Sequence, residues 1–293
     1  MSLNEVFGNW KKWGDADEKG ALNYITPEVV KQSLKSVEFG KIYSLAYPIV
    51  DNSPRYPVWP NRSRPVHVSR LSYRDEESGS GDDVIVLNTH NQTHLDALGH
   101  VWSDGKIYNG YNQSDNVSSK GLKMCGIDKV GGIVTRGILL DIPKLKKTEY
   151  LKKGEAIDSN DLEMAAEMEG VKLRSGDSLL VYTGHSRTWD SHNPLDYFRG
   201  NPGLSEDTVD LIDRYQISLI GSDNYSVEVE PLPDGKYDIP LHKELLWKRG
   251  IYLLELMNLD DIVKDCVYKF LFVVAPLPIN GGFGSPVNPL AIR

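Results

Sequence analysis

Apolar and polar positions follow one another along the chain in blocks that predict strands separated by short helices. Apolar runs rich in β-branched side chains and bounded by turn residues are typical of buried strands. They occur at residues 42–50, 84–87, 137–142, 178–183, 217–220, 251–257 and 269–277. The pattern alone therefore predicts a protein of mixed α and β structure.

Helix start and stop signals lie between several of these strands. Thr26, Pro27 and Glu28 supply a capping hydroxyl, a proline at the first helical position and an acid in the first turn, which predicts a helix over residues 27–36. Asn160 and Glu163 form a capping-box pattern, which predicts a helix over residues 161–169. Further helices are expected at residues 205–215 and 242–248.

Two segments are expected to form loops. Residues 47–65 carry five prolines interleaved with Tyr56 and Trp59, which predicts a stiff loop that presents aromatic side chains. These two aromatic residues either pack on the body of the protein or form the wall of a substrate pocket. Residues 75–83 are polar and rich in Gly and Ser, which is typical of a mobile loop.

The strand expected at residues 84–87 ends where polar and metal-binding side chains begin. His90, His94, Asp96 and His100 fall within eleven residues. If the backbone stays extended from His94 to Asp96, both side chains project to the same side, and a turn at residues 91–93 can fold His90 back over them. Imidazole and carboxylate ligands suit a divalent ion such as Zn²⁺ or Mn²⁺.

Three ligands leave coordination positions open, which is typical of a catalytic metal, because bound water can lose a proton there near neutral pH. His100 follows one turn later and is not needed as a ligand. The HExxH pattern of helix-borne zinc proteases is absent.

Glu255 is the second informative residue, because it interrupts the apolar run IYLLELM. A carboxylate within a buried strand costs free energy unless it is paired with a cation. The cation is either a bound metal or an arginine or lysine side chain.

Composition and net charge indicate which class of molecule this protein binds. The chain has 293 residues, of which 40% are hydrophobic and 25% charged, and its net charge is −8. An acidic chain with a pI near 5.4 is a poor partner for nucleic acid or an anionic membrane, so a small-molecule substrate is expected. Residues 1–20 lack an apolar signal core and no apolar run reaches eighteen residues, so a cytoplasmic location is expected.

The string His90-x-x-Thr93-His94-x-Asp96-Ala97-x-x-His100 resembles the HxGTHxDxPxH signature of the metal-dependent cyclase family, which includes bacterial kynurenine formamidase and isatin hydrolase. Gln92 stands where the family usually has Gly, and Leu98 where it often has Pro. Neither is a ligand, so these departures bear on pocket shape more than on metal binding. Further blocks resemble longer family members from about residue 15 to the end of the chain, among them TRGILLDI, GSDNYSVE and GGFGSPVNP.

The resemblance implies an α+β fold of the swivelling β/β/α type, as one domain over residues 1–293 with an N-terminal extension of about 40 residues. It also implies a homo-oligomer, either a dimer or a tetramer. His90, His94 and Asp96 match the metal-binding positions, His242 and Glu255 match the pair that completes the site in binuclear members, and His100 matches the catalytic histidine. One or two Zn²⁺ or Mn²⁺ ions are therefore expected.

The expected activity is hydrolysis of an amide, lactam or related acyl bond in a small cyclic or aromatic substrate. Two alternatives remain at this stage. One is a metal-dependent cyclase or dehydratase, in which the same Lewis acid promotes ring closure. The other is a binding module that holds a metal and a ligand without turnover.

Overall fold

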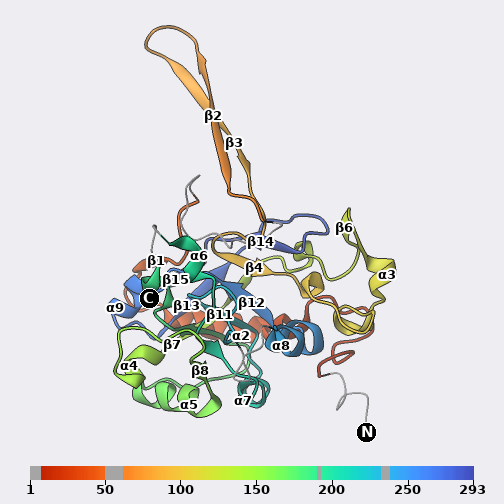
Figure 1. Cartoon of the computed structure of the whole chain (residues 1–293), viewed down its shortest axis with the longest axis vertical. Helices are drawn as coiled ribbons and strands as arrows, with labels where there is room; N and C mark the ends of the chain where they lie inside the picture. The colour runs from red at the N-terminus through yellow and green to blue at the C-terminus, as the bar shows by residue number, and fades with distance from the viewer. Residues whose placement is uncertain (1–7, 50–61, 190–192, 232–237) are drawn as a thin grey trace.

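The computed structural model describes residues 8–49, 62–189, 193–231 and 238–293. A nine-stranded mixed sheet forms its centre, in the order β1-β15-β13-β7-β9-β11-β12-β4-β14 (Figure 1). The strands are β1 (Ile42–Ser44), β4 (His94–Asp96), β7 (Ile133–Asp141), β9 (Ser178–Tyr182), β11 (Leu219–Ser222), β12 (Tyr252–Glu255), β13 (Lys269–Val274), β14 (Gly284–Pro286) and β15 (Leu290–Ile292). Six of the seven predicted strands therefore lie in this sheet, several with shorter bounds.

Strands β7, β9, β11 and β12 run parallel to one another, and the other neighbours in the sheet pair antiparallel. Their side chains are almost all buried, as expected for parallel strands covered on both faces. The sheet curls on itself. Leu45 and Tyr47 follow β1, yet their backbones bond to Asn258 and Thr93, which lie beside β12 and β4.

The helices are short and surround the sheet. Figure 1 shows α4, α5 and α7 gathered on one side of the molecule. The helices are α2 (Pro27–Ser33), α3 (Gln113–Asn116), α4 (Ile142–Lys146), α5 (Ser159–Met168), α6 (Pro194–Tyr197), α7 (Thr208–Tyr215), α8 (Pro240–His242) and α9 (Asp260–Lys264). Among the described residues, none of the helices is both long and apolar enough to cross a membrane.

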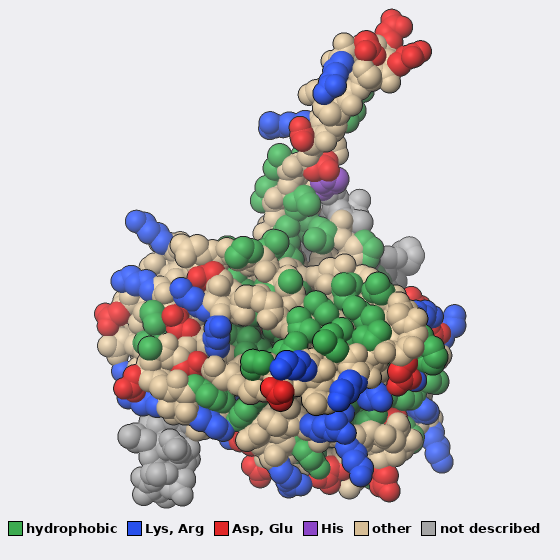
Figure 2. Space-filling view, turned by 180° about the vertical axis from the view of Figure 1, so that it is seen from behind, with side chains coloured by type: hydrophobic (Ala, Val, Ile, Leu, Met, Phe, Trp, Pro, Cys, Tyr) green, Lys and Arg blue, Asp and Glu red, His purple; other side chains and the backbone are tan. Residues whose placement is uncertain are grey.

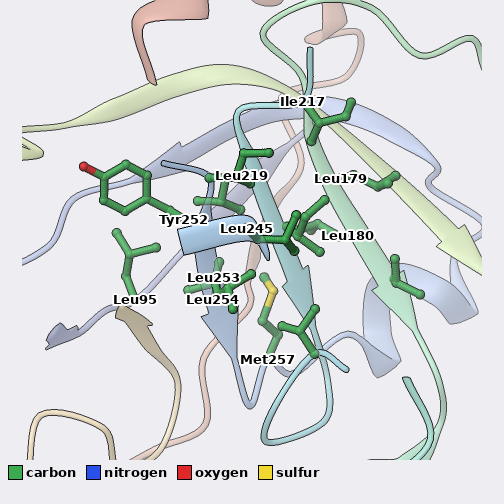
Figure 3. Close-up of a cluster of buried hydrophobic side chains, with 14 of the residues drawn as sticks. Leu95, Leu179, Leu180, Ile217, Leu219, Leu245, Tyr252, Leu253, Leu254 and Met257 are labelled. Atoms are coloured by element: carbon green, nitrogen blue, oxygen red, sulfur yellow. The ribbon is translucent and has the colours of Figure 1, made fainter. Parts of the chain in front are cut away.

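Helix α8 continues directly into η7 (Lys243–Arg249), a π-helical segment that ends at Gly250. Figure 3 shows Leu245 of η7 among buried side chains of β9, β11 and β12, including Leu180, Leu219 and Leu254. The N-terminal segment covers the same helix from outside, where Trp10 packs edge-on against Trp247 with ring centroids 5.0 Å apart. This packing holds the helix that begins with His242 against the sheet.

The two capping predictions had different outcomes. Thr26 accepts a hydrogen bond from Val29 N, and the predicted helix is confirmed as α2 followed by the 3₁₀ helix η2 (Leu34–Ser36). Helix α5 is also confirmed, but its cap is Asp158 and not Asn160. Asp158 and Asp161 form the capping box, because a carboxylate satisfies the first-turn N–H groups and complements the positive helix end.

Residues 84–87 were predicted to form a buried strand. Residues 84–86 do lie in a strand, but its side chains are exposed. Strand β3 (Gly79–Val86) pairs with β2 (Val66–Tyr73) in a ribbon that projects far from the body (Figures 1 and 2). Ile85 and Val86 are 51% and 60% exposed. The predicted loop at residues 75–83 is accordingly only the tip of this ribbon and part of β3. Apolar β-branched residues favour a strand whether or not another layer covers it, so their presence did not report burial.

Candidate metal centre

The centre of the candidate site is β4, which lies between β12 and β14. His94 stands opposite Glu255 of β12, and Asp96 stands two residues further along the same strand. Residues opposite one another in a sheet, and residues two apart in a strand, share a face. His94, Asp96 and Glu255 therefore project to one side, as the expected extended backbone requires.

A turn brings His90 to the same place. Asn88 accepts hydrogen bonds from His90 N through its side chain and from Asn91 N through its backbone carbonyl. The turn therefore begins earlier than the predicted residues 91–93. His90 Nε2 then lies 3.2 Å from Asp96 Oδ1. Gly284 of β14 leaves the space for this ring, since a Cβ at residue 284 would lie only 2.7 Å from His90 Nε2.

Five side chains converge at this point, although two of them come from distant parts of the chain. His94 Nε2 is 3.5 Å from Asp96 Oδ1 and 3.3 Å from Glu255 Oε2. His242 Nε2 is 3.2 Å from Glu255 Oε1 and 3.8 Å from Asp96 Oδ2. The structure thus brings together all five residues expected to hold metal, with the two carboxylates between the three imidazoles.

These residues fit a divalent metal. His90 Nε2, His94 Nε2, Asp96 Oδ1 and Glu255 Oε1 are buried and make no hydrogen bond to any described residue. Buried polar atoms without partners are rare and call for an explanation, and an ion satisfies all four. His94 donates from Nδ1 to the carbonyl of Gln92 at 2.9 Å, which leaves the Nε2 lone pair facing the site. The nitrogen and oxygen donor set suits Zn²⁺ or Mn²⁺.

The charges in the cluster shift one another's pKa values. Burial by itself raises the pKa of Asp96, but His100, His90 and His94 together hold it well below its ordinary value. Burial by itself lowers the pKa of His242, but its contacts with Glu228 and Glu255 raise it well above the ordinary value. The cluster therefore keeps Asp96 anionic, which is the form that binds a metal.

His100 ends the 3₁₀ helix η3 (Leu98–His100) and stacks on His90, with ring centroids 4.2 Å apart. Burial, together with the neighbouring His90 and His242, lowers the pKa of His100 to about 3. One ligand atom each of His90, Asp96 and His100 lie within 4.8 Å of one another. This position suits a metal ligand as well as a proton shuttle.

Sequence reasoning missed Glu228, which is 1% exposed and faces His242. Its carboxylate accepts hydrogen bonds from the backbone N–H groups of Leu241 and His242, at 2.9 and 3.0 Å, and from His242 Nδ1. Nδ1 is thereby occupied, so Nε2 faces Glu255 and Asp96. The alternation of acid and apolar residues in Val227-Glu228-Val229-Glu230 is a signal that could have drawn attention to this residue.

Arg62 is a second residue that the sequence did not single out. Its Nη1 donates to the carbonyl of His90 at 3.1 Å, and the charges of Glu255 and Asp96 act on its guanidinium. Burial lowers the pKa of Arg62 while these two carboxylates raise it. A partly buried cation thus borders the carboxylates of the cluster.

Comparisons with known proteins place the chain in a family. The model of the Cyclase family matches residues 43–229. The chain belongs to the Cyclase family. A solved structure described as a novel cyclase is 32% identical to it, covers 98% of this chain and 100% of its own, and superimposes with a TM-score of 0.90.

Two further relatives of this Cyclase-family protein have lower sequence identity to it. It is 26% identical over 254 residues to the kynurenine formamidase of Geobacillus thermodenitrificans, an alignment that spans 82% of this chain and 95% of the relative. Isatin hydrolase A from Labrenzia aggregata has the same fold, with a TM-score of 0.62 at 19% identity over 92% of this chain and 98% of its own.

The family match ends between the two halves of the cluster. It includes His90, His94, Asp96 and Glu228, whereas His242 and Glu255 lie beyond it. The structure joins the two groups. Tyr56 and Trp59, the candidate pocket residues, lie outside the described residues.

Proposed function

We propose that this protein is a metal-dependent hydrolase that cleaves an amide, lactam or related acyl bond in a small cyclic or aromatic substrate. The observation that carries the proposal is the convergence of three imidazoles and two carboxylates, in which four of the facing atoms, one each from His90, His94, Asp96 and Glu255, are buried and lack hydrogen bonds to the described residues. The named activities of the kynurenine formamidase and isatin hydrolase relatives support the same reaction class.

His90, His94, Asp96, His242 and Glu255 would hold one or two Zn²⁺ or Mn²⁺ ions. When bound, such an ion polarises an acyl carbonyl and lowers the pKa of a water molecule. The mutual contacts of the five side chains hold their donor atoms in place before an ion arrives, so little reorganisation accompanies binding.

The remaining groups position the reactants and move protons. His100 lies against His90 at the edge of the cluster, where its imidazole can pass a proton to the nitrogen that leaves the acyl carbon. Glu228 holds His242 in the orientation that directs Nε2 to Glu255. No covalent intermediate with the protein is required.

Turnover measured against metal content tests the proposal. Purified protein, supplied with Zn²⁺ or Mn²⁺ or stripped with EDTA, is incubated with a panel of aryl formamides, lactams and esters, and products are followed by mass spectrometry. We expect a mass gain of one water that is lost in EDTA. Loss of one water would instead indicate ring closure or dehydration, and full activity in metal-free protein would refute a metal-dependent reaction.

A further inference from the structure

Gln92 stands between two of the candidate metal ligands, His90 and His94, in a conformation that does not favour it. Its φ is +56°, in the left-handed region that glycine adopts without steric cost. Gln92 is also buried, with only 1% of the residue exposed. A longer residue at a position suited to glycine needs a reason beyond the fold.

The carboxamide of Gln92 has no structural role among the described residues. Both Nε2 and Oε1 are buried, and neither makes a hydrogen bond with any residue that the structure describes. A carboxamide offers two N–H donors and a carbonyl acceptor, and leaving such groups buried without partners is unfavourable. The carboxamide can therefore form hydrogen bonds with a bound molecule, because no described residue of the chain occupies its donor or its acceptor.

Gln92 lines a cavity of about 460 Å³ beside β4 and β14. This volume suits a small organic molecule. The cavity walls are mostly apolar, and the described lining residues include no Asp, Glu, Lys or Arg: Ser44, Ala46, Tyr47, Pro48, Ile49, Gln92, Thr93, Ala275, Leu277, Pro286, Val287 and Asn288. Such walls suit a neutral group.

The other polar side chains of this wall have partners already. Thr93 Oγ1 accepts from Tyr47 N at 3.1 Å and donates to the Leu256 carbonyl at 2.6 Å. Ser44 Oγ donates to Asn288 Oδ1 at 2.7 Å. Asn288 is exposed, whereas the carboxamide of Gln92 is buried with both its donor and its acceptor still without a hydrogen bond to the described residues.

We infer that this cavity is a subsite for a neutral apolar group that carries a carboxamide-type function, with its N–H and C=O side by side. Gln92 Oε1 accepts from that N–H while Nε2 donates to that C=O. The inference rests on the proposed function and deepens it, because Gln92 and Thr93 of the cavity wall directly precede the candidate ligand His94, and the subsite would hold a part of the substrate away from the bond that is cleaved.

Two probes of equal shape test this inference. Benzamide carries both a donor and an acceptor, whereas acetophenone has a methyl group in place of the NH₂ and only accepts. Dissociation constants for the full chain are measured by ligand-observed NMR, with metal supplied and, in parallel, with EDTA. We expect benzamide to bind about five- to tenfold more tightly than acetophenone in both conditions, which corresponds to one or two net hydrogen bonds.

The variant Gln92→Met keeps the length of the side chain and removes the carboxamide, so the preference for benzamide should disappear. Gln216→Met is the matched control, because Gln216 also has a left-handed φ, of +52°, and is exposed at the end of α7. It should keep the preference. Gln92→Gly removes the steric strain of a side chain at a left-handed φ, so this second variant should fold well. It should also lose the preference for benzamide.

Equal affinity of the two probes for the wild-type protein, an undiminished preference in Gln92→Met, or no binding of either probe would each overturn the inference. Binding in EDTA does not depend on turnover. A protein that binds benzamide selectively but hydrolyses nothing would therefore refute the proposed function and leave the subsite standing.

Discussion

The Glu228 carboxylate forms hydrogen bonds with both the backbone N–H and the imidazole ring of His242. Its carboxylate accepts a hydrogen bond from His242 N at 3.0 Å and from Nδ1 of the same residue, and it accepts a third from Leu241 N at 2.9 Å. A charged acceptor with three donors fixes both the start of α8 and the direction of the imidazole. Glu228 is thus a positioning residue for the half of the cluster formed by His242 and Glu255.

Replacing Glu228 with Gln should weaken metal binding. The amide NH₂ would face either Leu241 N or the two N–H groups of His242, so the hydrogen bonds that fix the start of α8 and the imidazole cannot all be kept. We expect metal affinity to fall by about 10- to 100-fold, measured by competition with a chromogenic chelator. Glu230→Gln is the control, because Glu230 is also buried but accepts a hydrogen bond from Tyr225 and not from His242. The metal affinity of this control variant should stay within about threefold of that of wild type. Unchanged affinity in Glu228→Gln would assign this residue to the scaffold alone.

Glu255→Gln should lower the ratio of metal to protein, because it removes a charge shared by His94 and His242. Its melting temperature should rise again when metal is added in excess. Bound metal stabilises the native state through linkage, by about 2.7 kcal/mol at 100 times the dissociation constant. Elemental analysis and thermal melts measure the two effects. A variant with full metal content and melting insensitive to added metal would leave a site built on His90, His94 and Asp96.

His100→Asn separates a proton shuttle from a ligand. Asparagine keeps a polar side chain but cannot accept and release a proton during turnover as an imidazole does. If His100 moves protons, the variant should retain its metal and lose turnover by about 10² to 10⁴-fold. Loss of stoichiometric metal would place His100 among the ligands instead, and wild-type turnover would remove it from the mechanism.

Glu169 predicts a pH dependence of stability that is independent of the metal cluster. Burial raises its pKa from 4.5 to about 8, although the hydrogen bond from Asp141 N acts in the opposite direction. Below pH 4.5 both the folded and the unfolded chain carry a protonated Glu169, so the group contributes nothing. As the pH rises from 4.5 to 8, the unfolded chain ionises first, and the free energy of unfolding falls.

Glu169→Gln should therefore be more stable than wild type above pH 8, by on the order of 1 to 3 kcal/mol, and equally stable near pH 4. Urea denaturation at several pH values measures the difference. Glu167→Gln, an exposed change in the same helix, should follow the wild-type profile. If the Glu169→Gln profile is also that of wild type, Glu169 ionises normally in the native state.

The sequence by itself determined the local part of the site. The spacing of His94 and Asp96 predicts a shared face because side-chain alternation in a strand is a property of neighbouring residues. Glu255 was conspicuous because a carboxylate in an apolar run is unfavourable without a cation. Similar local reasoning predicted α2 from Thr26 and Pro27, because a capping hydrogen bond spans only three residues.

Only the tertiary structure decided which distant groups meet. Glu228 and His242 are in contact because the chain after β11 folds back against α8, and nothing in the spacing of these residues requires it. The apolar run at residues 84–87 forms a strand by local preference, yet its burial depended on whether another layer covered β3. Contacts of this kind follow from the packing of the whole chain, which a local pattern of residues does not specify.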